Sequence, residues 1–312
     1  MPHHRPDHSA HTAHHAGAFD SDRIADALTL EGTLAAGVTD QAIAQCAELF
    51  DAGDAEVCRI LDLGCGPGVA TVALAAAFPS AAVVAVDGSR AMLARAEARA
   101  SRHGASARVE TRELDLDGDL GALGTFDLAW AGMAIHHAAD EVAALRSVRA
   151  LLRPHGLVCL LERADPIVVR LADDLGRPGI WDRVRAAQSD WFERARPTLP
   201  GALNADRYPG ILNAAGFDVV VSQTLADTMT APDDAATRTF LTNQLQRATR
   251  NLADFLAAAD LTALQACVEP ASPPHAGDRW AGATVTTSRK LFIARQQDDH
   301  RTTMTVRQHG TV

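Results

Sequence analysis

The sequence of 312 residues has few aromatic side chains, almost no lysine and no long apolar run. Aromatic residues make up 4%, and Lys290 is the one lysine among 29 basic residues. Hydrophobic residues still reach 47%, which is ample for a buried core. No apolar run attains the roughly 18–20 residues that a membrane span needs, and the polar N-terminus lacks the apolar stretch of a signal peptide. We therefore expect a cytoplasmic protein that does not cross a membrane.

The cysteines and the net charge bear on three questions: the redox compartment, metal binding and nucleic-acid binding. The five cysteines form no C-x-x-C pair and are widely spread, which predicts free thiols in a reducing compartment and no metal site. The formal net charge of −10 disfavours general nucleic-acid binding, because an acidic protein repels phosphate backbones. We expect a small-molecule substrate, and a homodimer is compatible with these features.

A histidine-rich tract opens the chain, and we interpret residues 1–19 as a disordered, solvated tail. The alternative is a zinc, nickel or copper site, since clustered imidazoles bind these ions. The tail is favoured because the spacing matches no closed tetrahedral site and brings no partner cysteine. The histidines concerned are His3, His4, His8, His11, His14 and His15.

The apolar periodicity changes along the chain in a way that predicts the fold class. Residues 20–50 have a helical pattern, which Gly37 divides into two helices, with Thr39 or Asp40 as the cap of the second. Strands are then predicted at 58–63, 81–86, 108–114, 126–131 and 157–161, alternating with helices at 69–78, 89–102 and 140–152. Strict alternation of apolar strands with helices indicates parallel strands joined by helical crossovers. With two later strands at 217–225 and 286–295, we expect an α/β fold with a doubly wound, mostly parallel, seven-stranded sheet.

The same pattern predicts the domain organisation. A core with N-terminal helices spans 20–163, continues at 206–227 with a helix at 208–215, and closes with the strand at 285–296. Two insertions interrupt it: 164–205, interpreted as a substrate lid, and 228–284, interpreted as helical. Residues 297–312 are expected to be a flexible tail. Trp181, Trp191, Phe192 and Tyr208 either wall an apolar pocket or pack the insertion.

A glycine-rich turn follows the first predicted strand. Gly64 and Gly66 permit positive φ and close ligand approach, and Gly68 is expected to let the next helix pack close to the strand. Amides at that helix N-terminus would face the ligand. The spacing is G-x-G-x-G, whereas the dinucleotide fingerprint is G-x-G-x-x-G. Asp87 ends the second strand, where a carboxylate can accept hydrogen bonds from a ribose diol, so NAD and other adenosyl ligands both fit this part.

Asp62 distinguishes between these ligands. It lies at the end of the first strand, where a carboxylate suits an amino group and would repel a pyrophosphate. The ligand predicted by this residue carries an ammonium group and no phosphate, as S-adenosylmethionine (SAM) does.

Five segments in this order resemble the class I SAM-dependent methyltransferases. Residues 61–68 (LDLGCGPG) resemble the first motif of that family, and 86–89 the second, whose acidic residue holds the ribose. Residues 114–116 fall where the family has an acidic residue facing the adenine, with Glu113 and Asp117 as alternatives to Asp115. Residues 126–130 with 135–137, and 151–157, resemble the elements around the fourth and fifth strands. The likeness covers about 40–163 well, and 206–225 and 286–295 more weakly.

The resemblance implies that the chain transfers a methyl group from SAM to an oxygen, nitrogen or carbon of a small molecule and releases S-adenosylhomocysteine, with no metal required. The alternatives are a SAM-binding enzyme with other chemistry and a non-catalytic SAM-binding module. The cofactor-binding residues that it implies are Asp62, Gly64, Cys65, Gly66, Gly68, Asp87, Gly88, Met92, Asp115, Leu116 and Ala131.

A general base helps when the nucleophile carries a proton, and His136, then His137, are the candidates. Both follow the carboxyl end of the fourth strand, where open α/β sheets bind their ligands. An ordinary imidazole has a pKa of about 6.5, which suits this work. The alternative is a structural pair of loop histidines that abstracts no proton. Glu162 and Arg163, after the fifth strand, either orient the substrate or form a solvated strand end.

Overall fold

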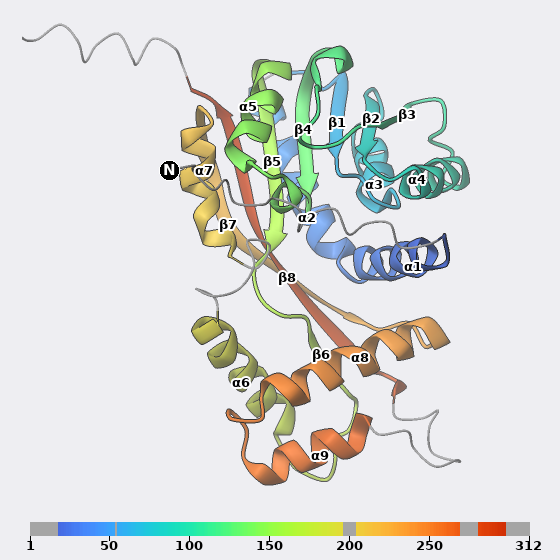
Figure 1. Cartoon of the computed structure of the whole chain (residues 1–312), viewed down its shortest axis with the longest axis vertical. Coiled ribbons are helices and arrows are strands. Elements are labelled where there is room, and N and C mark those ends of the chain that lie inside the picture. The colour runs from blue at the N-terminus through green and yellow to red at the C-terminus, as the bar shows by residue number, and fades with distance from the viewer. Residues whose placement is uncertain (1–17, 54, 196–203, 269–279, 298–312) are drawn as a thin grey trace, which may run out of the picture.

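A computed structural model describes residues 18–53, 55–195, 204–268 and 280–297. The predicted histidine-rich tail lies outside these ranges except for its last two residues, and so do positions 298–312 of the predicted C-terminal tail. The described chain forms an upper α/β core and a lower group of helices, joined by two long strands (Figure 1).

The elements follow the predicted alternation closely. The strands are β1 (Arg59–Leu63), β2 (Ala82–Asp87), β3 (Val109–Glu113), β4 (Phe126–Gly132), β5 (Leu152–Arg163), β6 (Val168–Arg170), β7 (Phe217–Thr230) and β8 (Thr284–Gln296). The α-helices are α1 (Ala18–Leu34), α2 (Ala36–Asp51), α3 (Val69–Ala77), α4 (Arg90–Arg102), α5 (Glu141–Leu151), α6 (Ile180–Ala195), α7 (Tyr208–Ala214), α8 (Ala235–Asn251) and α9 (Ala258–Val268). Short 3₁₀ turns include η2 (Ile135–His137) after β4.

The sheet has the order β3-β2-β1-β4-β5-β8-β6, with β7 also paired to β8. Strands β1 to β5 pair in parallel, and β8 runs antiparallel to β5, β6 and β7. The α/β fold with a doubly wound, mostly parallel sheet is therefore confirmed. The sequence did not predict the three-residue strand β6, which is too short to carry a readable periodicity.

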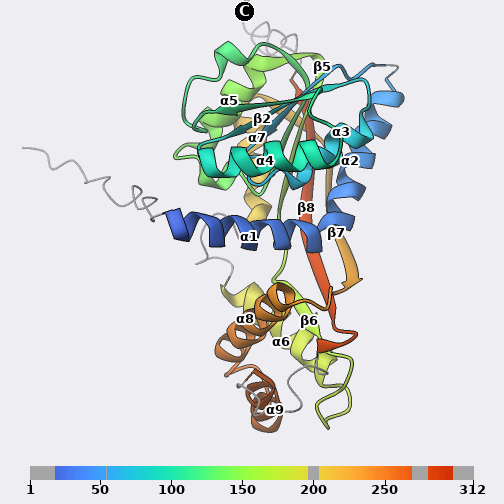
Figure 2. The same cartoon turned by 90° about the vertical axis from the view of Figure 1, so that its right-hand side faces the viewer.

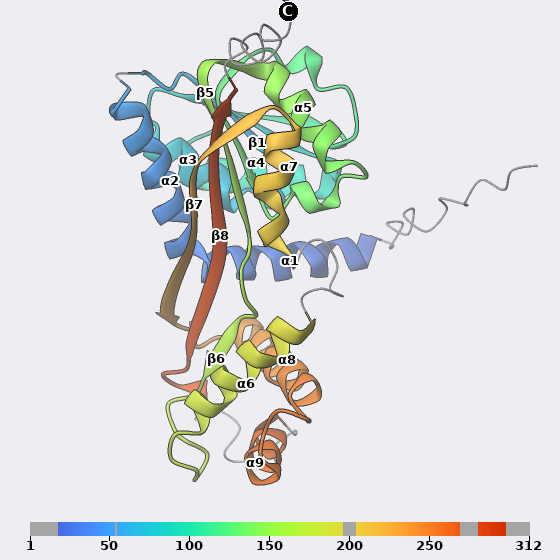
Figure 3. The ribbon, with the colours of Figure 1, turned by 90° about the vertical axis from the view of Figure 1, so that its left-hand side faces the viewer.

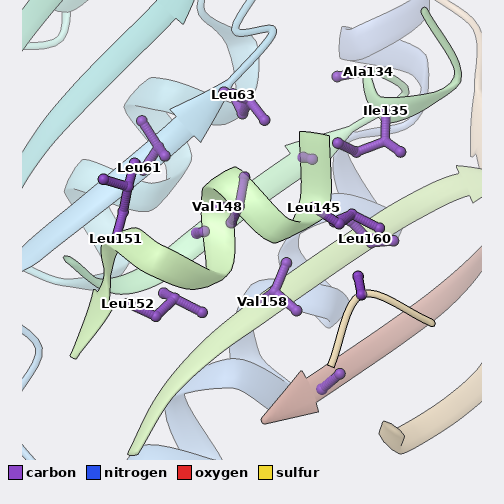
Figure 4. Close-up of a cluster of buried hydrophobic side chains, with 14 of the residues drawn as sticks. Leu61, Leu63, Ala134, Ile135, Leu145, Val148, Leu151, Leu152, Val158 and Leu160 are labelled. Atoms are coloured by element: carbon purple, nitrogen blue, oxygen red, sulfur yellow. The ribbon is translucent and has the colours of Figure 1, made fainter. Parts of the chain in front are cut away.

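Helices cover both faces of this sheet. On one face, α5 and α7 share an apolar cluster with Leu61 and Leu63 of β1, and on the other, α2 and α3 share one with Ile60 and the neighbouring strands. Leu145, Val148 and Leu151 recur at helical spacing on α5 and point at the sheet (Figure 4). Burying each such side chain contributes about 1.5–3 kcal/mol, so this face is fixed by the apolar spacing of α5.

The break between the first two helices differs from the prediction. It lies at Ala35, and Thr39 is inside α2 together with Asp40, so neither caps the helix. Gly37 serves close packing, because a Cβ there would overlap the carboxylate of Asp227. The prediction was wrong because Gly37 makes room for Asp227 and does not end a helix.

Strands β7 and β8 extend beyond the core and carry the second group of helices (Figure 3). Helices α6, α8 and α9 pack with β6 around their own apolar cluster, which Leu34 of α1 joins. Trp181 is buried in this cluster and Trp191 packs against it. Phe192 is buried as well, and Tyr208, the first residue of α7, is buried in the cluster of the core. These aromatics therefore pack the fold instead of lining an apolar pocket. Within the described ranges, no helix is long and apolar enough to cross a membrane.

Candidate active site

The glycine-rich turn lies at the carboxyl end of β1 and has the predicted backbone. Gly64, Gly66 and Gly68 have φ of 67°, 52° and 77°, a region that L side chains rarely adopt. The Cys65 amide donates to the carbonyl oxygen of Val86 at 2.9 Å, which anchors the turn to β2. Because the backbone has positive φ at these three alternate positions, other residues there would be strained.

The three glycines differ in what a side chain at each position would contact. A Cβ on Gly64 would lie 2.5 Å from the Cβ of Ala134, and one on Gly68 would lie 2.7 Å from the Cα of Ala96 in α4. A Cβ on Gly66 would meet nothing within 4 Å, so this glycine borders open space. Gly68 therefore admits α4, which corrects the expectation that it serves packing of the next helix on the strand.

Asp87 holds the turn from the end of β2. Its Oδ2 accepts a hydrogen bond from the Gly66 amide at 2.9 Å, and its Oδ1 accepts one from the Ser89 amide at 2.8 Å. Ser89 caps α4 by accepting from the Met92 amide, and Gly88 lies between these two acceptors. The carboxylate predicted to meet the ribose diol thus also shapes the loop, a structural role that its spacing alone did not predict.

Asp62 is buried beneath the same turn, with 1% of its surface exposed. Thr71 Oγ1, from the first turn of α3, donates to Asp62 Oδ2 at 2.6 Å. Burial raises the pKa of Asp62 to about 7; the Thr71 hydrogen bond opposes this rise and the nearby Asp87 charge adds to it. A cation that reaches this carboxylate would relieve its desolvation.

Trp130 lies beside Asp62 on β4, at the directly paired position, and was not among the predicted ligand residues. Its side chain is 1% exposed, and its Nε1 has no hydrogen-bond partner among the described residues. A Cβ on Gly132 would lie 3.0 Å from this nitrogen, so the indole N–H borders the carboxyl end of β4. A buried donor without an acceptor suits the carboxylate of a ligand.

These residues fit SAM better than a dinucleotide. Two carboxylates at the turn match an ammonium and a diol, and the free indole N–H matches a carboxylate, whereas a pyrophosphate would face Asp62 and Asp87. Arg99, which contacts the turn, donates its Nε to the Pro67 carbonyl oxygen at 3.0 Å and is thereby engaged. Among the residues described here, no cluster of His, Cys, Asp and Glu has the geometry to hold a metal ion.

The acidic residues predicted to face the adenine lie at the end of β3 and just after it. Glu113 accepts two hydrogen bonds from Arg90, and Asp117 accepts from the Ala139 amide. Asp115 is exposed and its Oδ1 accepts from the Asp117 amide, so it is the least engaged of the three acidic candidates. Leu116, beside it, is partly buried against the apolar cluster under α5.

His136 lies in η2, directly after the turn at Met133, which has a φ of 57°. Its Nδ1 is 2.8 Å from Oε2 of Glu162, at the end of β5. The Glu162 side chain is fully buried, and its Oε1 has no hydrogen-bond partner among the described residues. Burial raises the pKa of Glu162, and the hydrogen bond and charge of His136 oppose that rise. His137 is exposed, and its ring centroid lies 4.2 Å from that of His136.

Comparison with known proteins agrees with this geometry. Residues 60–156 match the family described as "Methyltransferase domain". In its motifs this matched segment is similar to the class I SAM-dependent methyltransferases. The chain is 31% identical to trans-aconitate 2-methyltransferase of Enterobacter sp. (strain 638), over 54% of this chain and 60% of that protein. It is 34% identical to malonyl-[acyl-carrier protein] O-methyltransferase of Legionella pneumophila, over 33% of this chain and 34% of that protein.

A solved chain from Bacillus halodurans C-125 is 16% identical, with a TM-score of 0.49, over 81% of this chain and 98% of that chain. The chain spans less than two thirds of the length of the curated relatives named above.

The core brings some of the predicted site residues together and leaves others facing away from the site. Asp62, Gly66, Asp87 and His136 converge at the carboxyl edge of the sheet. The Ala131 side chain is buried under α5 and that of Cys65 is buried near α4, so their side chains face the core and only their backbone borders the site. Sequence reasoning missed Trp130 and Thr71, whose apolar and alanine-rich surroundings are typical of core positions.

Proposed function

We propose that the chain is a SAM-dependent methyltransferase that acts on a small-molecule acceptor and releases S-adenosylhomocysteine. The observation that carries this proposal is the turn at Gly66, which borders open space and is flanked by the carboxylates of Asp62 and Asp87. The named relatives act on trans-aconitate and on malonyl-[acyl-carrier protein], which supports an acceptor built on a small carboxylic acid.

SAM supplies an activated methyl group on a sulfonium, so the main work of the chain is to align the acceptor with it. Asp62 and Trp130 are placed to hold the amino-acid end of the cofactor, Asp87 the ribose, and Asp115 the adenine. The amide of Gly66 already bonds Asp87, so the turn is preorganised before the cofactor binds.

His136 is the residue placed to accept a proton from the acceptor. Glu162 binds its Nδ1, which fixes the ring and leaves Nε2 to take the proton. The buried Glu162 stabilises the imidazolium that forms, in the manner of the carboxylate in hydrolase triads. A hydroxyl or ammonium acceptor would use this base, whereas an ionised carboxylate would need none.

The first test is binding of S-adenosylhomocysteine to the full chain, measured by isothermal titration calorimetry. Asp87→Asn should weaken binding by about tenfold to a hundredfold, since hydrogen bonds to a charged group contribute about 1.5–3 kcal/mol each. Asp119→Asn is a matched control, because Asp119 also accepts a hydrogen bond from the amide two residues later, at Gly121. Unchanged affinity in Asp87→Asn would reject the ribose assignment.

The second test is catalytic. The wild-type chain is incubated with SAM and a panel of small carboxylic acids. It should release S-adenosylhomocysteine and a methylated product in equal amounts. Binding without release would favour a non-catalytic module, and consumption of SAM without methylated product would favour other chemistry on the same fold.

A further inference from the structure

Two arginines lie directly opposite each other where β5 and β8 leave the core. Arg163 and Arg289 are register partners in this antiparallel pair, so their side chains share one face. The Arg289 side chain is 4% exposed and that of Arg163 is 17% exposed. Like charges at directly paired positions destabilise a sheet, so this arrangement needs a negative charge between the two guanidinium groups.

The chain supplies that charge from α1. Oε1 of Glu31 accepts a hydrogen bond from Nη2 of Arg289 at 3.0 Å and another from Nη2 of Arg163. Arg247 of α8 is a third positive group close enough to act on Glu31. The two guanidinium groups therefore converge on one carboxylate oxygen, although guanidinium groups can bind both oxygens of a carboxylate.

The titration behaviour of the cluster agrees with a shortage of negative charge. Burial would raise the pKa of Glu31, but Arg163 and Arg289 outweigh it and lower that pKa. Burial, followed by the charge of Arg163, lowers the pKa of Arg289 to about 10, although Glu31 and Glu162 act in the opposite direction. Of the neighbouring carboxylates, Glu162 is bonded to His136, and Asp165 accepts from Ser288.

The cluster adjoins the proposed site of methyl transfer. Glu162, which binds His136, and Arg289 are close enough for each charge to shift the pKa of the other, and α1 crosses between the core and the lower helices at this level (Figure 2). At its other end, α1 is tied to α4 by Arg95, which binds Asp22 and Asp26. Glu31 is thus part of a covering helix, whereas both arginines belong to the sheet.

We propose that Arg163 and Arg289 bind a carboxylate of the acceptor substrate, and that Glu31 occupies their site when no substrate is bound. The proposal rests on the methyltransferase function proposed above and names its substrate class: small anionic molecules with at least one carboxylate. An anionic substrate displaces Glu31, supplies the negative charge that Glu31 otherwise gives to the arginine pair, and places its reacting end toward His136.

The test measures binding of malonate, a small dicarboxylate, to the full chain saturated with S-adenosylhomocysteine. Glu31→Gln removes the competing charge and should tighten malonate binding about tenfold relative to wild type. Arg289→Gln should weaken it by at least tenfold, and malonamide, the uncharged analogue, should not bind measurably to any variant. Arg95→Gln is the matched control, because it loosens α1 at its other end and leaves the arginine pair intact; it should not change the affinity.

Any of the following results would overturn the proposal. Equal malonate affinity in wild type and Glu31→Gln, including no binding to either, would show that Glu31 does not occupy an anion site. An equal gain in Arg95→Gln would show that only loosening of α1 matters, and equal binding of malonamide would exclude charge recognition. Glu31→Gln keeps the test valid if Arg289→Gln fails to fold. If the wild-type chain does not bind S-adenosylhomocysteine, the proposed methyltransferase function itself is wrong.

Discussion

Replacing Asp62 by asparagine should stabilise the ligand-free protein at neutral pH while weakening its hold on the cofactor. Asp62 is buried and has one described hydrogen-bond donor, Thr71, so its negative charge is poorly compensated until a cationic ligand arrives. Asparagine keeps the shape and the ability to accept from Thr71, and it carries no charge at any pH. The substitution therefore isolates the electrostatic cost of the buried carboxylate.

The magnitude follows from the pKa of Asp62, which burial raises from 3.8 to about 7. Because the folded state holds this proton more tightly than the unfolded state, stability is fully present below the unfolded pKa and falls as pH rises toward the folded pKa. The whole loss is about 4 kcal/mol, at about 1.4 kcal/mol per unit, and about 3 kcal/mol of it falls between pH 5 and pH 8. The new amide needs an acceptor and costs about 1–3 kcal/mol, but equally at each pH.

The assay is urea unfolding of wild type and Asp62→Asn at pH 5 and at pH 8. The stability of Asp62→Asn relative to wild type should rise by about 3 kcal/mol between the two values. Thr71→Val removes the donor that favours the ionised form and should make the pH dependence of the protein steeper. Saturating S-adenosylhomocysteine should flatten it in wild type. A relative stability that is the same at both pH values would refute the reasoning.

Two further pairs of substitutions test the site. Gly66→Val should abolish S-adenosylhomocysteine binding in calorimetry with a stability loss of about 1–3 kcal/mol from its positive φ, whereas Gly68→Ala should chiefly destabilise the protein in urea, by about 1–3 kcal/mol, because its Cβ meets Ala96. His136→Gln should lower kcat for a hydroxyl or amine acceptor by about 10²–10⁴. Glu162→Gln should lower kcat less, with S-adenosylhomocysteine affinity unchanged in both; unchanged kcat in His136→Gln would leave the histidine a structural role.

The sequence predicted those parts of the fold that are determined by residues close together in the chain. The alternation of apolar strands and helices, the glycines at positive φ and the start of the helix predicted over 89–102 are short-range signals, and the structure reproduces them. The break at Gly37 was misplaced, because that glycine makes room for Asp227, 190 positions away in the chain. The lengths of β7 and β8 were underestimated, since their outer ends, 226–230 and 284–288, are mostly polar and pair only with each other and with β6.

The arginine pair shows why part of a site escapes sequence reasoning. Arg163 was identified as a candidate because it follows a predicted strand, but Arg289 and Glu31 lie 126 and 132 positions away from it along the chain. Only the antiparallel return of β8 brings Arg289 opposite Arg163, and only the path of α1 places Glu31 between them. The one local signal was the polar run 286–290, which contains Arg289 and precedes the apolar half of the closing strand. A charged residue that a strand buries needs a partner, so such a run predicts that a counter-charge exists without saying which part of the chain, or which substrate, provides it.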